Sequence, residues 1–312
     1  MKEYEDIRDD QIRVIGDTPY KKTSSRKGKI IVIAVILAVV GTVIFFLAAG
    51  GKENTTVPPK TVDVSKEVEL ALFEPEEPAM SAEMETDMLN QQYFGDSVDS
   101  LVKGFVEIKD TLINDVPLKL YIPHNAEMSL HIGRMDKNDT TVVYAAQAAD
   151  VRADNGGIVG AFVLNGEPLA WGISKKGYCA SINGVVTIGV AENSPLFEQA
   201  TGHGGYFFRQ YPLVSDGKVV ENEPKGKAIR RSICDRDGEI FMVETGSKES
   251  FHDFSQALVD LGVDQAVYLV GSSAYGWAVD GEGVVHEFGE DNYYKGRRRM
   301  PRNTSYIVWR RK

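Results

Sequence analysis

The feature that most constrains this chain is an uncharged apolar run near its N-terminus, IIVIAVILAVVGTVIFFLAA, at residues 30–49. A helix of ~20 such residues spans the ~30 Å hydrocarbon core of a bilayer. A helix buried in a protein core is rarely apolar on every face over that length. The run therefore predicts one transmembrane helix that separates a short N-terminal segment from the bulk of the chain.

The positively charged residues around this run predict its orientation. Lys52 and Lys60 follow the run, whereas a larger group precedes it, namely Lys21, Lys22, Arg26, Lys27 and Lys29. Because cytoplasmic flanks are rich in Lys and Arg, residues 1–29 are predicted to be cytoplasmic. The remainder is then extracytoplasmic, either periplasmic or at the cell surface. A cleaved signal peptide is the alternative, but its apolar region is ~7–15 residues long and follows a shorter leader.

Residues 50–95 are predicted to form a spacer. They are rich in Glu, Pro, Thr and Met, and they contain the segments Pro58-Pro59 and Glu74-Pro75-Glu76-Glu77-Pro78. Such a composition favours an extended, solvated chain over a packed unit. The folded domain is therefore predicted to occupy residues 96–312.

This domain contains many short strand-like segments joined by turns. Runs such as VPLKLYIP, TTVVYAAQAAD, GEIFMVET and TSYIVW are rich in β-branched and aromatic residues. Asn-Gly pairs at residues 165–166 and 183–184 suit turns that need positive φ. Near the start of the domain, residues 98–108 partly follow a helical period and predict a short helix leading into it.

One longer helix is well marked. Ser250 can cap it and Asp253 follows three residues later, as in a capping box. Four apolar residues then form one stripe that ends at Gly262, namely Phe251, Phe254, Leu258 and Leu261. A strand and the loop Gly271-Ser272-Ser273 come next. The predicted fold class is α+β: a strand-rich mixed-sheet domain with a few helices, preceded by one transmembrane helix.

Charge and composition narrow the functional classes. The net charge of −10 disfavours a general nucleic-acid partner, which would need a basic surface to displace counterions. The five histidines form no i,i+4 pair and no His/Cys cluster, so the sequence predicts no metal and no cofactor. Cys179 and Cys234 fit either one disulfide or two buried thiols. Nothing in the residues specifies an oligomeric state.

Three segments in order, FFRQYPLVSDGKVV, AIRRSICDRDGEIFMV and SFHDFSQALVDLGVDQAVYLVGSS, resemble the phosphodiester glycosidase domain family. The resemblance covers roughly Val151 to Trp277. It implies hydrolysis of a sugar-1-phosphodiester bond. Where the family has Asn-Leu-Asp-Gly-Gly-Gly-Ser, however, this chain has Tyr-Leu-Val-Gly-Ser-Ser-Ala, and the family's acidic residue falls on Val270.

The chemistry of that reaction directs the choice of candidate catalytic residues. A carboxylate must stabilise an oxocarbenium-like centre, and arginine can hold the charge of a departing phosphate. Arg209 and Arg231 are the predicted phosphate-binding arginines, the second at the family's arginine position. Asp154 and Glu167, which lie in loops, are the predicted carboxylates. Alternative roles are ion pairs for the arginines and turn formation for the acids.

The predicted substrate-binding residues lie in small or aromatic segments: Asn155, Tyr206, Gly271, Ser272 and Ser273. Tyr206 could stack on a sugar, although such aromatic clusters more often pack in a core. The sequence therefore predicts a membrane-anchored phosphodiester glycosidase that acts on an envelope or extracellular glycan. The alternative is a catalytically inactive relative that binds a glycan or an envelope partner.

The C-terminal part of the chain is basic, unlike the protein as a whole. It contains KGRRRMPR at residues 295–302 and ends in WRRK. Such residues could contact an anionic glycan or membrane headgroups, or could simply be solvated surface.

Overall fold

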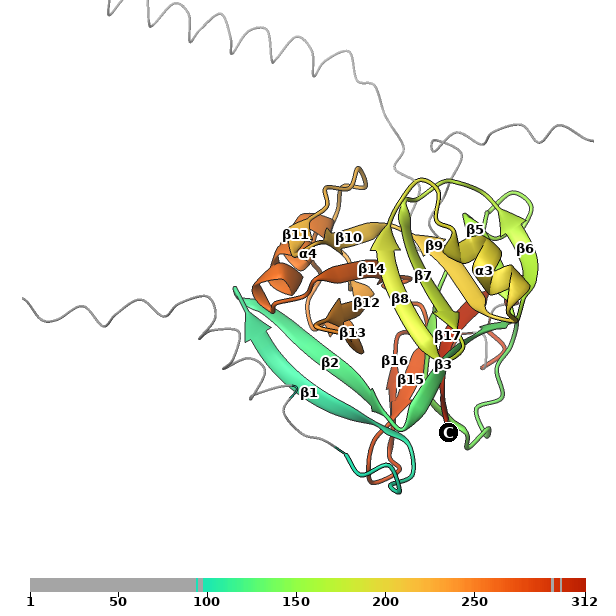
Figure 1. The fold of residues 1–312 in the computed structure, drawn as a ribbon. Helices are drawn as coiled ribbons and strands as arrows, with labels where there is room; N and C mark the ends of the chain where they lie inside the picture. Colours follow the sequence, from blue (N-terminus) through green and yellow to red (C-terminus); the bar gives the residue numbers. More distant parts are fainter. Residues whose placement is uncertain (1–93, 95–97, 293–294, 298) are drawn as a thin grey trace, which may run out of the picture. The chain divides into compact units, whose positions relative to one another are not determined.

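The computed structural model describes Phe94 and residues 98–292, 295–297 and 299–312. These residues form three β-sheets and two α-helices (Figure 1). All strand pairings among them are antiparallel. The described residues therefore form a strand-rich domain.

The first sheet has seven strands in the order β1-β2-β13-β12-β14-β10-β11. Its longest hairpin pairs β1, Phe105–Ile113, with β2, Val116–His124, across a turn in which Asn114 and Asp115 both have positive φ. The remaining strands are β10 (Pro212–Ser215), β11 (Lys218–Val219), β12 (Arg231–Arg236), β13 (Glu239–Thr245) and β14 (Gln265–Leu269).

The other two sheets have five strands each. The second sheet has the order β16-β15-β4-β17-β3 and the third β6-β5-β9-β7-β8. The second consists of β3 (Ala126–Ile132), β4 (Val142–Gln147), β15 (Gly276–Val279), β16 (Val285–Phe288) and β17 (Ser305–Arg311). The third consists of β5 (Ala161–Leu164), β6 (Glu167–Trp171), β7 (Gly177–Ile182), β8 (Val185–Val190) and β9 (Tyr206–Gln210).

The main hydrophobic core is shared by all three sheets. It includes Tyr121 and Ile233 from the first sheet, Tyr144 and Ile307 from the second, and Phe208 from the third. The first sheet buries its other face against helix α4, Phe251–Asp260, and the third against helix α3, Leu196–Gly202. Each helix thus covers one outer face of a sheet.

Helix α4 confirms the sequence prediction for residues 250–261. The Ser250 hydroxyl accepts a hydrogen bond from the Asp253 backbone N–H at 2.9 Å, as an N-cap residue should. The predicted apolar stripe is buried against the first sheet. The sequence prediction for this helix succeeded because capping and periodicity agree.

The predicted fold class is wrong in two respects. The sheets are antiparallel, not mixed; even β14, which follows α4, pairs antiparallel with both β10 and β12. The predicted helix at residues 98–108 is also wrong, because Phe105 already belongs to β1, which the Asn114-Asp115 turn pairs with β2.

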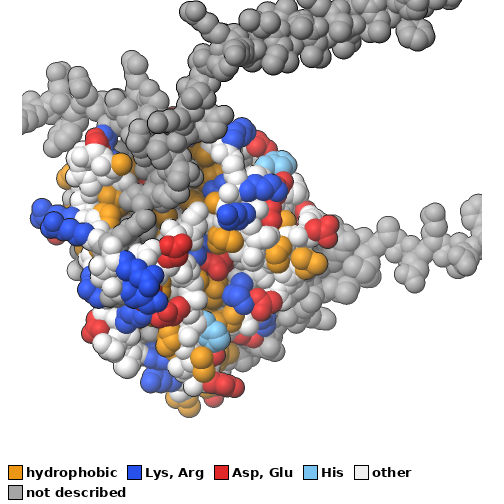
Figure 2. Space-filling model, turned by 180° about the vertical axis from the view of Figure 1, so that it is seen from behind, with side chains coloured by type: hydrophobic (Ala, Val, Ile, Leu, Met, Phe, Trp, Pro, Cys, Tyr) orange, Lys and Arg blue, Asp and Glu red, His pale blue; other side chains and the backbone are white. Residues whose placement is uncertain are grey.

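The predicted transmembrane run at residues 30–49 lies outside the described residues, as do the predicted boundaries at residues 29, 49 and 95. Among the helices that the structure does describe, none is long and apolar enough to cross a bilayer. On the domain surface, acidic and basic side chains are interspersed on the face shown in Figure 2, and several Lys and Arg side chains stand close together there.

Candidate functional site

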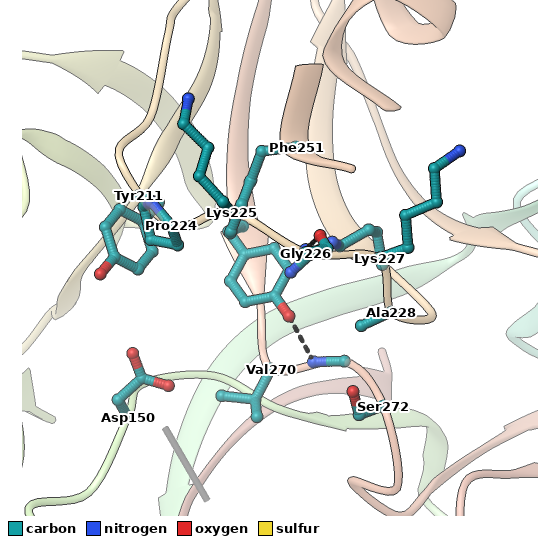
Figure 3. A pocket seen from close by; sticks show the side chains of 13 residues that line it. Asp150, Tyr211, Pro224, Lys225, Gly226, Lys227, Ala228, Phe251, Val270 and Ser272 are labelled. Atoms are coloured by element: carbon teal, nitrogen blue, oxygen red, sulfur yellow. Dashed lines mark hydrogen bonds between the residues drawn. The ribbon is translucent and has the colours of Figure 1, made fainter. Parts of the chain in front are cut away.

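A pocket of about 80 Å³ lies beyond the C-terminal end of β14 (Figure 3). Three segments surround it: the loop that follows β14, residues 224–228 after β11, and the start of α4. Its lining residues are Asp150, Tyr211, Pro224, Lys225, Gly226, Lys227, Ala228, Arg230, Phe251, Tyr268, Val270, Gly271 and Ser272. A Cβ at Gly271 would lie 2.1 Å from the Ile229 carbonyl oxygen, so the loop requires glycine at this position.

The pocket floor contains a buried carboxylate, Asp150, which is 4% exposed. The Lys175 ammonium forms an ion pair with it and also donates to the Gln210 side-chain oxygen at 2.9 Å. The same ammonium lies 3.9 Å from the centre of the Tyr211 ring. Burying these two charges is tolerable because they are paired and share further polar contacts.

Arg230 provides a fixed cation in the pocket wall. Its Nε donates to the Glu249 carbonyl at 2.9 Å, and its Nη2 donates to the Gly226 carbonyl at 2.7 Å. The guanidinium stacks on Phe251 at 4.1 Å from the ring centre. Two hydrogen bonds and one stacking contact hold the guanidinium in place without a carboxylate partner among the described residues, so its positive charge is not neutralised locally.

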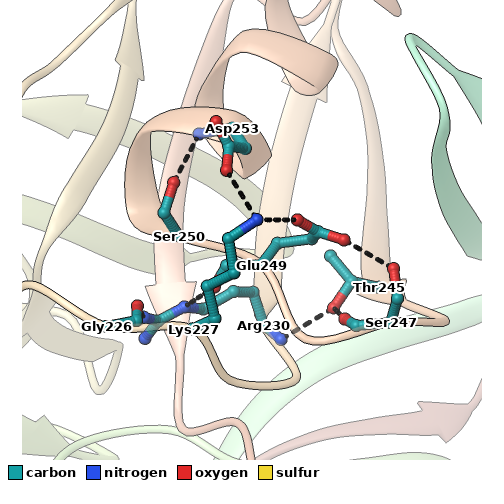
Figure 4. A network of polar contacts seen from close by, with 8 residues as sticks. All are labelled: Gly226, Lys227, Arg230, Thr245, Ser247, Glu249, Ser250 and Asp253. Carbon is teal, nitrogen blue, oxygen red and sulfur yellow. Dashed lines mark hydrogen bonds and ion pairs between the residues drawn. The ribbon is translucent and has the colours of Figure 1, made fainter.

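Two lysines stand at the rim and differ in their surroundings. Lys225 is exposed, forms no ion pair with a described residue, and extends outward from the pocket in Figure 3. Lys227 lies 3.4 Å from the Glu249 carboxylate and 3.3 Å from that of Asp253 (Figure 4). Lys227 thus ties its segment to the first turn of α4, whereas the charge of Lys225 is available to a ligand.

Tyr268 and Val270 complete the inner wall. The Tyr268 hydroxyl oxygen accepts a hydrogen bond from the Gly271 N–H at 3.1 Å. Burial raises the pKa of this hydroxyl, and the neighbouring Arg230 partly opposes the increase. Tyr268 is therefore a neutral hydrogen-bonding group, and Val270 contributes only an apolar surface.

Unusual backbone conformations occur at one lining residue of the pocket and at Lys175, the partner of Asp150. Among the described residues, nine non-glycine residues have positive φ, and seven of these are Asn or Asp in turns. The two exceptions are Lys175, with φ of 67°, and Ser272, with φ of 52°. Neither Lys nor Ser shares the preference of Asn and Asp for this region. Such strain concentrates at functional sites, so both residues support the choice of this pocket.

Of the sequence-predicted substrate-binding residues, Gly271 and Ser272 line the pocket and Ser273 follows in the same loop. Asn155 lies elsewhere, where its side chain accepts from the Gly157 N–H at 2.8 Å in a turn. Tyr206 is half-buried at the start of β9 and packs against the main core. Neither Asn155 nor Tyr206 lines the pocket.

The two predicted catalytic arginines are buried in supporting positions. Arg231 pairs with Glu244 and donates to the carbonyl oxygens of Val270 and Ala274, at 3.2 and 2.8 Å. Arg209 donates to the carbonyls of Lys175, Ala191 and Glu192. Neither arginine lines the pocket. Arg231 holds the backbone of the loop that follows β14, and Arg209 holds the backbone at Lys175.

The two predicted carboxylates are not brought together with these arginines. Asp154 pairs with Arg152, whose hydrogen bond lowers the pKa of Asp154 to about 2. Glu167 is exposed on the edge strand β6. Their catalytic roles stay predictions without a pocket to support them, because neither side chain lines it.

Sequence reasoning missed the residues that give the pocket its charge: Asp150, Lys175, Lys225 and Arg230. One signal was available for Asp150, which is the single charged residue of the alanine-rich run AAQAAD. Among the described residues, no three His, Cys, Asp or Glu side chains gather in a way that could hold a metal ion. Cys179 and Cys234 are separate buried thiols, so the disulfide alternative does not apply to this structure.

Comparison with protein-family models and with curated proteins gives no match. Among solved structures, the chain is similar to the catalytic domain of zebrafish N-acetylglucosamine-1-phosphodiester α-N-acetylglucosaminidase, auto-inhibited by its pro-peptide. The identity is 12%, the match covers 69% of this chain and 85% of that one, and the TM-score is 0.48. A hypothetical protein from Synechocystis matches at 13% identity, with 67% and 62% coverage and a TM-score of 0.43.

Both similarities are distant, with TM-scores below 0.5, and neither supports a statement about activity.

Proposed function

We propose that the pocket binds an anionic carbohydrate, such as a sugar phosphate, without hydrolysing it. The observation that supports this proposal is the charge of the lining, which includes Lys225, Lys227 and Arg230 but a single carboxylate, Asp150. Asp150 is itself paired with Lys175. The pocket is therefore positive within a protein of net charge −10, which favours an anionic group.

The rings in the wall suit a carbohydrate as the remainder of the ligand. Tyr211, Phe251 and Tyr268 present aromatic surfaces, on which the C–H groups of a sugar can pack. Asp150 and the Ser272 hydroxyl are polar groups that can bond sugar hydroxyls. Aromatic surfaces combined with placed polar groups are typical of small-ligand sites.

Hydrolysis is disfavoured because the pocket lacks a second carboxylate. Glycosidases generally use two, one of which is a nucleophile or base. Asp150 is the single acid among the described lining residues, and its charge already has a partner in Lys175. Val270 occupies the position at which the resembling family has its acidic residue, and it can neither accept a proton nor stabilise positive charge.

Calorimetric titration of the full-length chain in a non-ionic detergent tests the proposal. N-acetylglucosamine 1-phosphate should bind, and uncharged N-acetylglucosamine should bind at least about ten-fold more weakly, since the phosphate contacts are worth ~1.5 kcal/mol or more. Lys225→Ala should weaken phosphate binding, whereas Lys248→Ala, at an exposed lysine outside the pocket, should not.

The same samples distinguish binding from hydrolysis if released sugar is measured after each titration. Sugar released by the wild type but not by Asp150→Asn would replace the binding proposal with the glycosidase predicted from sequence. Equal affinity for the charged and uncharged sugars would overturn the proposed anionic ligand, and no binding of either without release of sugar would overturn both alternatives. The membrane anchor and the extracytoplasmic localisation stay predictions, because residues 30–49 lie outside the described residues.

A further inference from the structure

Four exposed basic side chains lie in the connection between β16 and β17 and are not explained by the pocket: Lys295, Arg297, Arg299 and Arg302, here called the basic loop. None of the four forms an ion pair with another described residue.

Two acidic residues near the basic loop share Lys137 as a partner. Glu287 pairs with Lys137 at 2.6 Å, and Asp291 lies 3.5 Å from the same ammonium. Lys137 is also the largest cause of the lowered pKa of Glu287, to which Lys295 adds a smaller effect. Asp154, farther along, pairs with Arg152. The three arginines of the basic loop form no ion pair with a described acid.

Both ends of the segment that contains the basic loop contact neighbours of the pocket. At its start, the Glu290 N–H donates to the Ser273 carbonyl at 3.0 Å, one residue from the lining residue Ser272. At its end, the Asn303 side chain donates to the Gly156 carbonyl at 2.7 Å. The turn that contains Gly156 begins soon after Asp150, the acid of the pocket floor. The segment that contains the basic loop is thus bonded at one end to the loop that lines the pocket and at the other to a turn that follows Asp150.

We infer that the basic loop is a second binding surface, which takes the continuation of a polyanionic glycan whose end group enters the pocket. This inference rests on the proposed function. A ligand with one phosphate would satisfy the pocket alone, whereas repeated charges along a chain would also satisfy the exposed arginines. Linking the two contacts in one molecule raises affinity because the second contact becomes intramolecular.

A membrane surface is the other anionic partner that such residues fit. The position of the basic loop favours the glycan, since its segment is bonded to the pocket loop at Ser273 and to the turn at Gly156. Binding to a lipid surface would not require the basic loop to be connected to the pocket. The two partners give different results in the same experiment.

The test compares two probes on the full-length chain in a non-ionic detergent: N-acetylglucosamine 1-phosphate and an oligomer of the same unit joined by phosphodiester bonds. The oligomer should bind the wild type about ten-fold or more tightly than the monomer does. In Arg299→Ala/Arg302→Ala this advantage should fall close to one-fold, with monomer affinity unchanged. The control, Lys218→Ala/Lys248→Ala, removes the same charge at exposed positions outside the basic loop and the pocket and should keep the advantage.

Other outcomes separate the inference from the proposed function. An unchanged oligomer advantage in the arginine variant would overturn the second surface while monomer binding leaves the pocket proposal standing. A third outcome would overturn the link to the pocket: the monomer does not bind, and oligomer binding depends on the arginines of the basic loop but not on Lys225 or Arg230. Arginine-dependent binding of phosphatidylglycerol-doped micelles, with no oligomer advantage, would replace the glycan by a lipid surface.

Discussion

Arg230 and Arg231 are adjacent in sequence but serve opposite faces of the seven-stranded sheet. The Arg230 guanidinium stacks on Phe251 in the cluster that α4 covers and lines the pocket. The Arg231 guanidinium lies 4.6 Å from the Phe288 ring centre in the core shared by all three sheets. Successive side chains of a strand point to opposite faces, so one position separates a candidate ligand-binding arginine from a structural one.

Arg231→Met should therefore destabilise the fold. It leaves the Glu244 carboxylate with no partner in a site that is largely buried, and breaking one half of such a pair costs about 3 kcal/mol. Urea unfolding of the full-length chain measures the change. The matched control is Lys119→Met, whose ion pair with Asp110 is exposed and should contribute less than about 1 kcal/mol. Equal midpoints for the two variants would contradict a structural role for Arg231.

Gly271→Ala should abolish ligand binding by the pocket. The added Cβ would lie 2.1 Å from the Ile229 carbonyl oxygen, so the loop must move. Gly202→Ala is the control, because a Cβ there has no neighbour within 4 Å and no positive φ is required. Titration with N-acetylglucosamine 1-phosphate should detect binding in the control only. Normal binding by Gly271→Ala would show that the loop does not shape the pocket.

Lys225 and Lys227 should respond differently to the same substitution. Lys225→Ala removes an unpaired rim cation and should lower affinity for a sugar phosphate about five-fold, the equivalent of ~1 kcal/mol. Lys227→Ala removes a charge already shared by Glu249 and Asp253 and should have the smaller effect. Calorimetric titration of both variants measures the difference. A larger loss of affinity in Lys227→Ala than in Lys225→Ala would show that Lys227, and not Lys225, contacts the ligand.

Asp139 should contribute a pH-dependent part of the stability. Hydrogen bonds from Thr141 and Arg310 lower the pKa of Asp139 from 3.8 to about 2. The contribution is therefore present above the unfolded pKa of ~3.9 and is lost as the pH falls through the folded pKa. Asp139→Asn should reduce stability near neutral pH by about 1 kcal/mol, after allowance for solvent screening, and should flatten its decline toward pH ~2. Asp115→Asn, in an exposed turn, should leave the urea-unfolding profile unchanged across the same pH range.

The contrast between α4 and the pocket explains what sequence reasoning could predict. The cap at Ser250 and the stripe that follows it are local signals, and both are present in the structure. Strand order is not local. The turns favoured hairpins, but the pairing of β14 with β10 and β12 depends on packing across the whole domain. The predicted mixed sheet was therefore wrong.

The candidate site was only partly predictable for a related reason. Gly271 and Ser272 stand out as a small-residue loop after a strand, and they line the pocket. Choosing between Arg230 and Arg231 requires knowing which face of β12 is which, and both faces are buried by apolar residues. No alternation in the sequence marks the difference. Asp150 and Lys175 meet because β4 and the β6–β7 connection converge, a relationship fixed by topology alone.

The last prediction concerns the Asp150–Lys175 ion pair. It tests whether the two buried charges stabilise the fold through each other or independently. Asp150→Asn alone leaves a buried ammonium without its carboxylate, and Lys175→Asn alone leaves the reverse, so each should cost about 3 kcal/mol. Asparagine suits the comparison at position 175 because it tolerates the positive φ found there. The double variant leaves no buried charge and should be much less destabilised than the sum of the two single changes. Urea unfolding of the four proteins measures this coupling. Additive losses of stability would show that the two charges do not compensate each other. The pocket would then present a free carboxylate. Such a carboxylate could repel an anionic ligand, or it could serve the hydrolysis that the proposed function excludes.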